Sequence, residues 1–75
     1  MKEQIYAMIA KQLKVDGARV TDDARLVEDL GADSANLMVL MMDVEDTFDI
    51  QVEDAAILTI KTAGDVAKYV EGALA

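Results

Sequence analysis

The chain has 75 residues, of which 15 are acidic and 7 are basic, and it contains no His, Cys, Pro or Trp. This length allows one small domain, over residues 1–75. Without His and Cys the usual general base and the strongest nucleophile are missing, which excludes a Ser-His-Asp triad, a Cys-His pair and His or Cys metal sites. The net charge of −8 disfavours nucleic acid as a partner and favours a basic protein surface.

Neither a targeting segment nor a membrane span is predicted. The apolar run at 5–10 is followed at once by Lys11 and Gln12, and no stretch approaches the roughly 18 apolar residues of a spanning helix. We therefore expect a cytoplasmic, monomeric protein without stable membrane insertion.

The negative charge is concentrated in the middle of the chain. Residues 1–19 hold four bases and two acids, and residues 55–75 hold two of each. Residues 20–33 hold five acids and one base, and residues 34–54 hold six acids and no base. A cationic partner is expected to dock on this middle segment. The alternative is a solvated acidic face that only keeps a small protein soluble.

The first helix is predicted over residues 2–15, because Ile5, Met8, Ile9 and Leu13 recur at helical spacing. Asp16-Gly17 is expected to end it, since Gly is common just past a helix. Residues 16–33 show no sustained period and form a long first loop. The loop has four apolar anchors: Val20, Leu26, Val27 and Leu30.

A turn at residues 31–34 leads into the second helix, predicted over residues 35–48. Either Asp33 or Ser34 is suited to cap its first N–H groups. One face of this helix has the spacing of a core stripe, formed by Leu37, Leu40, Met41, Val44 and Phe48.

The last third of the chain predicts a short helical turn at 53–58, opened by Glu53 and Asp54, and a final helix. Residues 62–65 approximate a capping box. They precede an apolar stripe of Val66, Tyr69, Val70, Ala73 and Leu74. The predicted fold is therefore all-α, a small antiparallel bundle of three main helices plus one short helix.

Ser34 is the only serine, and it stands where the second helix begins. No His, and no Lys within the helix start, is available to activate it as a catalytic nucleophile. Two roles remain: a helix cap, or an exposed hydroxyl that accepts a group from another enzyme.

The segment Leu26–Ser34, LVEDLGADS, resembles the attachment site of acyl carrier proteins, in which a serine after Leu-Gly-x-Asp carries 4′-phosphopantetheine from coenzyme A. Residues 20–23, 45–49 and 60–66 are also similar to segments of this family. The resemblance implies that Ser34, preceded by Asp33, holds the arm. It also implies a non-enzymatic carrier of acyl thioesters between enzymes of fatty-acid, lipid or polyketide biosynthesis.

The partners implied by the resemblance are a phosphopantetheinyl transferase and acyl-transferring or condensing enzymes with basic docking patches. The chain departs from the family pattern at Ala35, where Leu is usual, at Val39, where an acid is usual, and at Leu58, a commonly charged position. These departures suggest a specialised carrier. The alternative is an acidic, carrier-like interaction module that is never modified.

A second apolar stripe lies on the second helix, opposite its core face. It consists of Ala35, Met38, Val39 and Met42, with Glu45 and Asp46 nearby. A helix that is apolar on two faces is either buried all round or uses the second face for binding. We expect these six residues to bind partners. The alternative is that Met38 packs on the short third helix.

Overall fold

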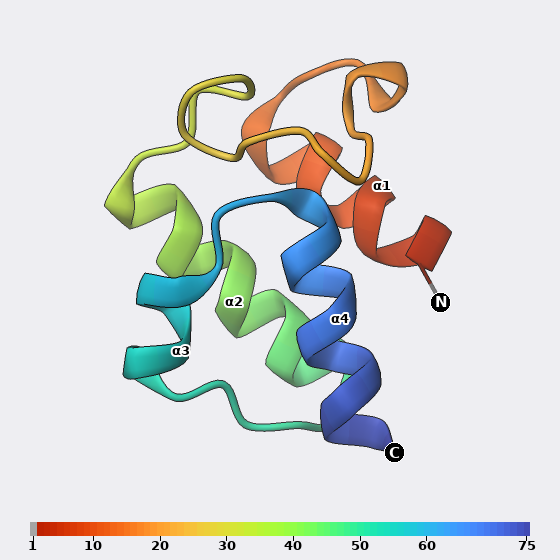
Figure 1. Ribbon diagram of the computed structural model, residues 1–75, viewed down its shortest axis with the longest axis vertical. Helices are drawn as coiled ribbons and strands as arrows, with labels where there is room; N and C mark the ends of the chain where they lie inside the picture. Colours follow the sequence, from red (N-terminus) through yellow and green to blue (C-terminus); the bar gives the residue numbers. More distant parts are fainter. Residues whose placement is uncertain (1) are drawn as a thin grey trace.

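The computed structural model describes residues 2–75, and over them the chain forms four α-helices and one 3₁₀ turn, with no strand (Figure 1). The all-α prediction is therefore confirmed, and α3 is the short helix. The elements are α1 (Lys2–Leu13), η1 (Gly17–Arg19), α2 (Ser34–Phe48), α3 (Asp54–Thr59) and α4 (Ala63–Leu74). No helix in this range is long and apolar enough to cross a bilayer.

The core lies where α1, α2 and α4 meet, because each helix turns one apolar stripe inward. Its largest fully buried side chains are Ile5, Ile9, Leu26, Leu40, Val44, Val66 and Val70. The predicted stripes of α1 and α2 supply four of them, which confirms the helical spacing. At the far end of α4, Ala73 and Leu74 are exposed instead.

The first helix ends earlier than predicted. Lys14 adopts the left-handed conformation, with φ of 57°, and the Val15 N–H donates to the Ala10 carbonyl at 3.0 Å. This is the hydrogen bond of a left-handed helix terminus. Asp16 instead opens η1, where its carboxylate accepts the Ala18 N–H at 3.0 Å. The expectation that Asp16-Gly17 ends the helix was therefore wrong.

The long loop between α1 and α2 is fastened to the segment that leads into α4. Three backbone hydrogen bonds join them: Leu26 N–H to Lys61 at 2.9 Å, Ala63 N–H to Ala24 at 3.0 Å and Gly64 N–H to Asp22 at 3.0 Å. A Cβ at position 64 would lie only 2.7 Å from the Asp22 carbonyl oxygen, so this close approach requires glycine.

The predicted loop anchors bury their side chains with one exception. Val20, Leu26 and Leu30 belong to the core, whereas Val27 is 53% exposed. Val27 lies in the turn between the buried residues Leu26 and Leu30. In this turn the Gly31 N–H donates a hydrogen bond to the Val27 carbonyl. Its side chain therefore faces outward, and the prediction of Val27 as an anchor was wrong.

Candidate functional site

Ser34 is the first residue of α2, and its side chain is exposed. Gly31, with φ of 75°, turns the chain toward the helix. Asp33 is the N-cap, because its carboxylate accepts the Asn36 N–H at 2.8 Å. The choice left open by the sequence is thus settled: Asp33 caps the helix, and Ser34 presents its hydroxyl at the rigid helix start.

The loop ahead of Ser34 is held by an ion pair with several contacts. Asp29 accepts hydrogen bonds from the Arg25 backbone N–H at 2.8 Å and from its guanidinium at 3.0 and 3.1 Å. The Arg25 guanidinium lowers the pKa of the Asp29 carboxyl, and Asp29 in turn raises the pKa of Arg25. The Ala32 N–H closes the turn on the Leu26 carbonyl at 2.8 Å. Ser34 therefore follows a well-braced turn.

A largely apolar groove of about 450 Å³ lies beside Ser34, between the loop, α2 and α3. Its charged lining residues are Asp54 and Lys61. Its other lining residues are Val27, Ser34, Leu37, Met38, Ile57, Leu58 and Ile60. An apolar group attached near Ser34 would find apolar surface within reach.

The contributions of Val27 and Leu58 to this groove were missed at the level of the sequence. Leu58 is 78% exposed and lies on α3. The one signal in the sequence was that an apolar residue stands at a position where the family commonly has a charge.

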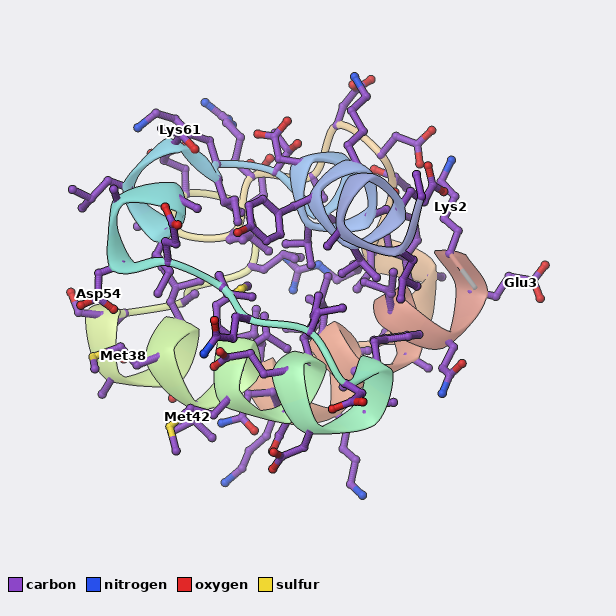
Figure 2. All side chains as sticks on the ribbon, turned by 90° about the horizontal axis from the view of Figure 1, so that it is seen from below. Lys2, Glu3, Met38, Met42, Asp54 and Lys61 are labelled. Carbon is purple, nitrogen blue, oxygen red and sulfur yellow. The ribbon has the colours of Figure 1, made fainter. Side chains whose placement is uncertain are left out.

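The outer face of α2 carries the second apolar stripe as predicted, because Ala35, Met38, Val39 and Met42 are all exposed. The exposed fractions of the three larger side chains are 58, 44 and 60% in chain order. Figure 2 shows Met38 and Met42 extending from α2 away from the other helices. Met38 borders the groove shared with α3 but is not covered by it.

The two predicted acidic docking residues differ in their surroundings. Glu45 is half-buried, and its carboxylate accepts the Val52 N–H at 3.0 Å, which holds the connection from α2 to α3. Asp46 is exposed. Asp46 is therefore accessible to a partner, although Lys11 and Lys14 line the same surface pocket, whereas Glu45 also has a structural contact to maintain.

The carboxylates of α2 and α3 have no base within their own segment, and Lys11 and Lys14 are the bases that share a surface pocket with Asp43 and Asp46. Residues 34–54 contain no Lys or Arg. Within residues 2–75 the ion pairs lie elsewhere: Lys2 with Asp22 at 2.7 Å, and Arg25 with Glu28 at 3.6 Å and Asp29 at 3.0 Å. In the same range no three acidic side chains are placed to hold a metal ion. The outer side of α2 thus combines exposed apolar side chains with exposed carboxylates, of which Asp43 and Asp46 lie near lysines.

Comparison with known proteins relates this arrangement to a single family. Residues 3–70 match the family model described as a phosphopantetheine attachment site. An acyl carrier protein of Helicobacter pylori strain J99 is 48% identical over 69 residues, which cover 92% of this chain and 88% of that protein. An acyl carrier protein of Thermotoga maritima is 43% identical over 68 residues, with 91 and 84% coverage.

Solved structures agree with the sequence relatives. A Mycobacterium tuberculosis structure described as that of an acyl carrier protein superposes with a TM-score of 0.88 at 39% identity and covers 95% of both chains. The acyl carrier protein of Enterococcus faecalis superposes with a TM-score of 0.82 at 25% identity, covering 96% of this chain and 91% of its own. With the sequence match over most of its length and this shared fold, the chain belongs to the acyl carrier protein family, whose phosphopantetheine attachment domain it contains.

Proposed function

We propose that Ser34 carries 4′-phosphopantetheine and that residues 1–75 act as one carrier domain. On this proposal the domain shuttles acyl groups, as thioesters of the arm, between enzymes of fatty-acid, lipid or polyketide biosynthesis. The observation that carries the proposal is the position of Ser34. The only serine of a chain in this family is exposed at the first residue of α2, directly after the capping Asp33.

The surroundings of Ser34 fit a phosphodiester-linked arm. On attachment the Ser34 Oγ–P bond forms, the pyrophosphate bond of coenzyme A breaks, adenosine bisphosphate leaves and the hydroxyl proton is released. The anionic phosphodiester would lie at the N-terminus of α2, where the helix dipole favours negative charge. Because the arm supplies the thiol for the thioester, the absence of Cys is compatible with this role. We propose no catalytic activity for the chain itself.

The outer face of α2 is proposed as the docking surface for the transferase and for acyl-transferring or condensing enzymes. Carboxylates such as Asp46 steer a basic patch toward the domain. The exposed stripe of Ala35, Met38, Val39 and Met42 then supplies the fit. Val39 and Leu58, where the family commonly has charges, support a specialised member with dedicated partners.

The test is the intact mass of the protein after incubation with coenzyme A and a promiscuous phosphopantetheinyl transferase. The wild type should gain one phosphopantetheine, and Ser34→Ala should gain none. Because Asp33 caps α2, Ser34→Ala should change the free energy of unfolding by no more than about 0.5 kcal/mol, as exposed substitutions do. An adduct on the Ala variant would show that another residue is modified. Failure of the wild type with several transferases would favour the unmodified acidic module.

A further inference from the structure

Two of the exposed side chains beside Ser34 are thioethers, and a third thioether next to them is buried. Met38 and Met42 are 58 and 60% exposed, whereas Met41 is only 3% exposed. Met38 and Met42 are four residues apart and therefore share one helix face. In Figure 2 both side chains extend outward from α2. Their sulfur atoms are thus open to solvent at the centre of the proposed docking surface.

Exposed thioethers react with peroxides. Hydrogen peroxide transfers one oxygen atom to the sulfur, whose lone pair forms the new S–O bond as the O–O bond breaks, and water leaves. Thioether sulfur is oxidised and peroxide oxygen is reduced. Hydrogen peroxide is uncharged at neutral pH, so the net charge of −8 does not repel it. Met38 and Met42 should therefore react well before Met41.

The consequence of this oxidation is local. A sulfoxide is polar and chiral where the thioether was apolar and flexible, and this change disrupts Met-rich interfaces. The side of α2 that enters the core uses Leu40, Met41 and Val44, all buried. Oxidation of Met38 and Met42 would thus alter the docking surface and leave the bundle intact.

We propose that Met38 and Met42 are a paired site of reversible oxidation, and that peroxide lowers the affinity of the carrier for its partners by converting both to sulfoxides. The effect on partners rests on the proposed function; the modification itself does not. Reversal requires a dithiol-dependent sulfoxide reductase, which returns the thioether while two thiols become a disulfide and water is released. The site would couple the carrier to the oxidation state of its surroundings.

The first measurement maps the oxidised residues. The protein is treated with limiting hydrogen peroxide, the excess is removed with catalase, and the products are analysed by mass spectrometry. Trypsin cuts after Lys and Arg, so one peptide, residues 26–61, contains all three methionines, and its fragmentation locates the added oxygen. Met38 and Met42 should be oxidised while Met41 remains a thioether. Oxidation of Met41 at the same rate would overturn the proposal.

The second measurement is the rate at which a transferase loads Ser34 before and after peroxide. Oxidised wild type should be loaded roughly fivefold to tenfold more slowly, as when a central interface contact is truncated. The reductase should restore the rate, and far-ultraviolet circular dichroism should stay unchanged. Met38→Leu with Met42→Leu keeps the apolar surface and removes both sulfur atoms, so its loading rate should not respond to peroxide.

The two proposals fail in different ways. If the unoxidised protein is never loaded, the proposed function is wrong regardless of peroxide. If the unoxidised protein is loaded normally and the oxidised protein is loaded at the same rate, only the redox inference is overturned. A slower rate that the reductase does not restore would also overturn it, because damage other than sulfoxide formation would then explain the loss.

Discussion

Within residues 2–75, two residues other than glycine hold left-handed backbone conformations, and both end helices. Lys14 has φ of 57° after α1, and Asp49 has φ of 53° after α2. A side chain in this conformation costs about 1–2 kcal/mol because Cβ approaches a carbonyl oxygen. The charges of the two residues act in opposite senses. A cation at a helix C-terminus interacts favourably with the helix dipole, and a carboxylate there interacts unfavourably.

Asp49→Gly should therefore stabilise the protein by about 1 kcal/mol, because it relieves the left-handed strain and removes an unfavourable charge. Lys14→Gly is the matched control. It relieves the same strain but loses a favourable charge, so its gain should be smaller. Urea unfolding of both variants measures the difference. An equal or larger gain for Lys14→Gly would show that the charge at the helix end contributes little.

Among the elements, α4 begins with a complete capping box, in which side chains accept the free backbone N–H groups at the start of the helix. Asp65 accepts the backbone N–H groups of Lys61 at 3.0 Å and Thr62 at 3.1 Å, and its own N–H donates to the Thr62 hydroxyl at 3.1 Å. These bonds, led by that from Lys61, lower the pKa of the Asp65 carboxyl. The pKa of Asp65 is lower in the folded protein than in the unfolded chain, where it is about 3.9. The ionised carboxylate therefore contributes its full stabilisation above the unfolded pKa. It is lost as the pH falls through the folded value.

Asp65→Asn should consequently destabilise the protein at pH 7 and lose most of this effect below about pH 4, as the wild-type carboxyl becomes protonated. The quantity to compare is the difference in unfolding free energy between wild type and variant at each pH. This difference removes the contribution of the other carboxylates, which titrate in both proteins. If the difference in unfolding free energy stayed constant down to the lowest pH, the ionised form of Asp65 would not be what stabilises the capping box.

The docking face of α2 gives a second prediction at this scale. Val39→Glu restores an acid where the family usually has one, and Met42→Glu places one at the centre of the exposed stripe. Both side chains are exposed, so unfolding free energies should change by no more than about 0.5 kcal/mol. Loading by the transferase and binding to a dedicated partner should weaken, more for Met42→Glu, because the centre of an interface is desolvated.

Unfolding of either variant would mean that the face belongs to the core. Unchanged loading and partner binding would mean that it is exposed but unused. Ala35→Glu places the same charge at the small residue that opens the stripe. Comparing its effect with that of Met42→Glu tells whether partners respond to the added charge alone or to the loss of the thioether contact.

The sequence predicted elements where the signal is local. The spacing of Ile5 and Ile9, and the capping pattern at Thr62, each depend on neighbours within about two turns, and the structure has them as expected. The prediction failed where distant contacts decide. Val27 faces outward because the loop around it is bound to residues 61–64, and the end of α1 depends on backbone geometry at Lys14 rather than on a glycine.

In the candidate site, too, the residues marked by local patterns were predictable and those brought together by the tertiary fold were not. Ser34 and the α2 stripe were predictable because a motif and a helical period mark them. The groove was not, because Val27, Met38 and Leu58 come from three segments that only the tertiary fold brings together. The structural contact of Glu45 with Val52 was also hidden, since it crosses a connection whose conformation no local pattern specifies.

At the scale of the whole molecule the excess charge is the dominant feature. The chain carries −8 within principal extents of 28, 23 and 19 Å, and the six acids of residues 34–54 have no base among them. Self-repulsion of this kind weakens a compact state, and salt reduces it, with a Debye length of about 8 Å at physiological ionic strength.

Added sodium chloride should therefore raise the melting temperature. A divalent cation should raise it more at equal ionic strength, because the screening is then the same and the divalent cation also associates directly with the carboxylates. Thermal unfolding followed by circular dichroism from low to high salt measures this response. Asp46→Asn, which removes one exposed charge from this acidic segment, should reduce the dependence on salt. A melting temperature that does not change with salt would mean that the carboxylates are too dispersed to repel one another.

The three backbone hydrogen bonds between the first loop and residues 61–64 set an order of events during synthesis. They join segments about forty positions apart, so the loop cannot make these bonds until residues 61–64 have left the ribosome. A nascent chain that ends before Lys61 contains Ser34. It lacks the backbone groups of residues 61–64 to which Leu26 and Ala24 form hydrogen bonds. The turn ahead of α2 can still make its local contacts, Arg25 with Asp29 and Ala32 with Leu26, but it is not yet fastened to residues 61–64. The placement of the loop that precedes Ser34 thus depends on residues 61–64, and a chain terminated before them would present the serine without this support.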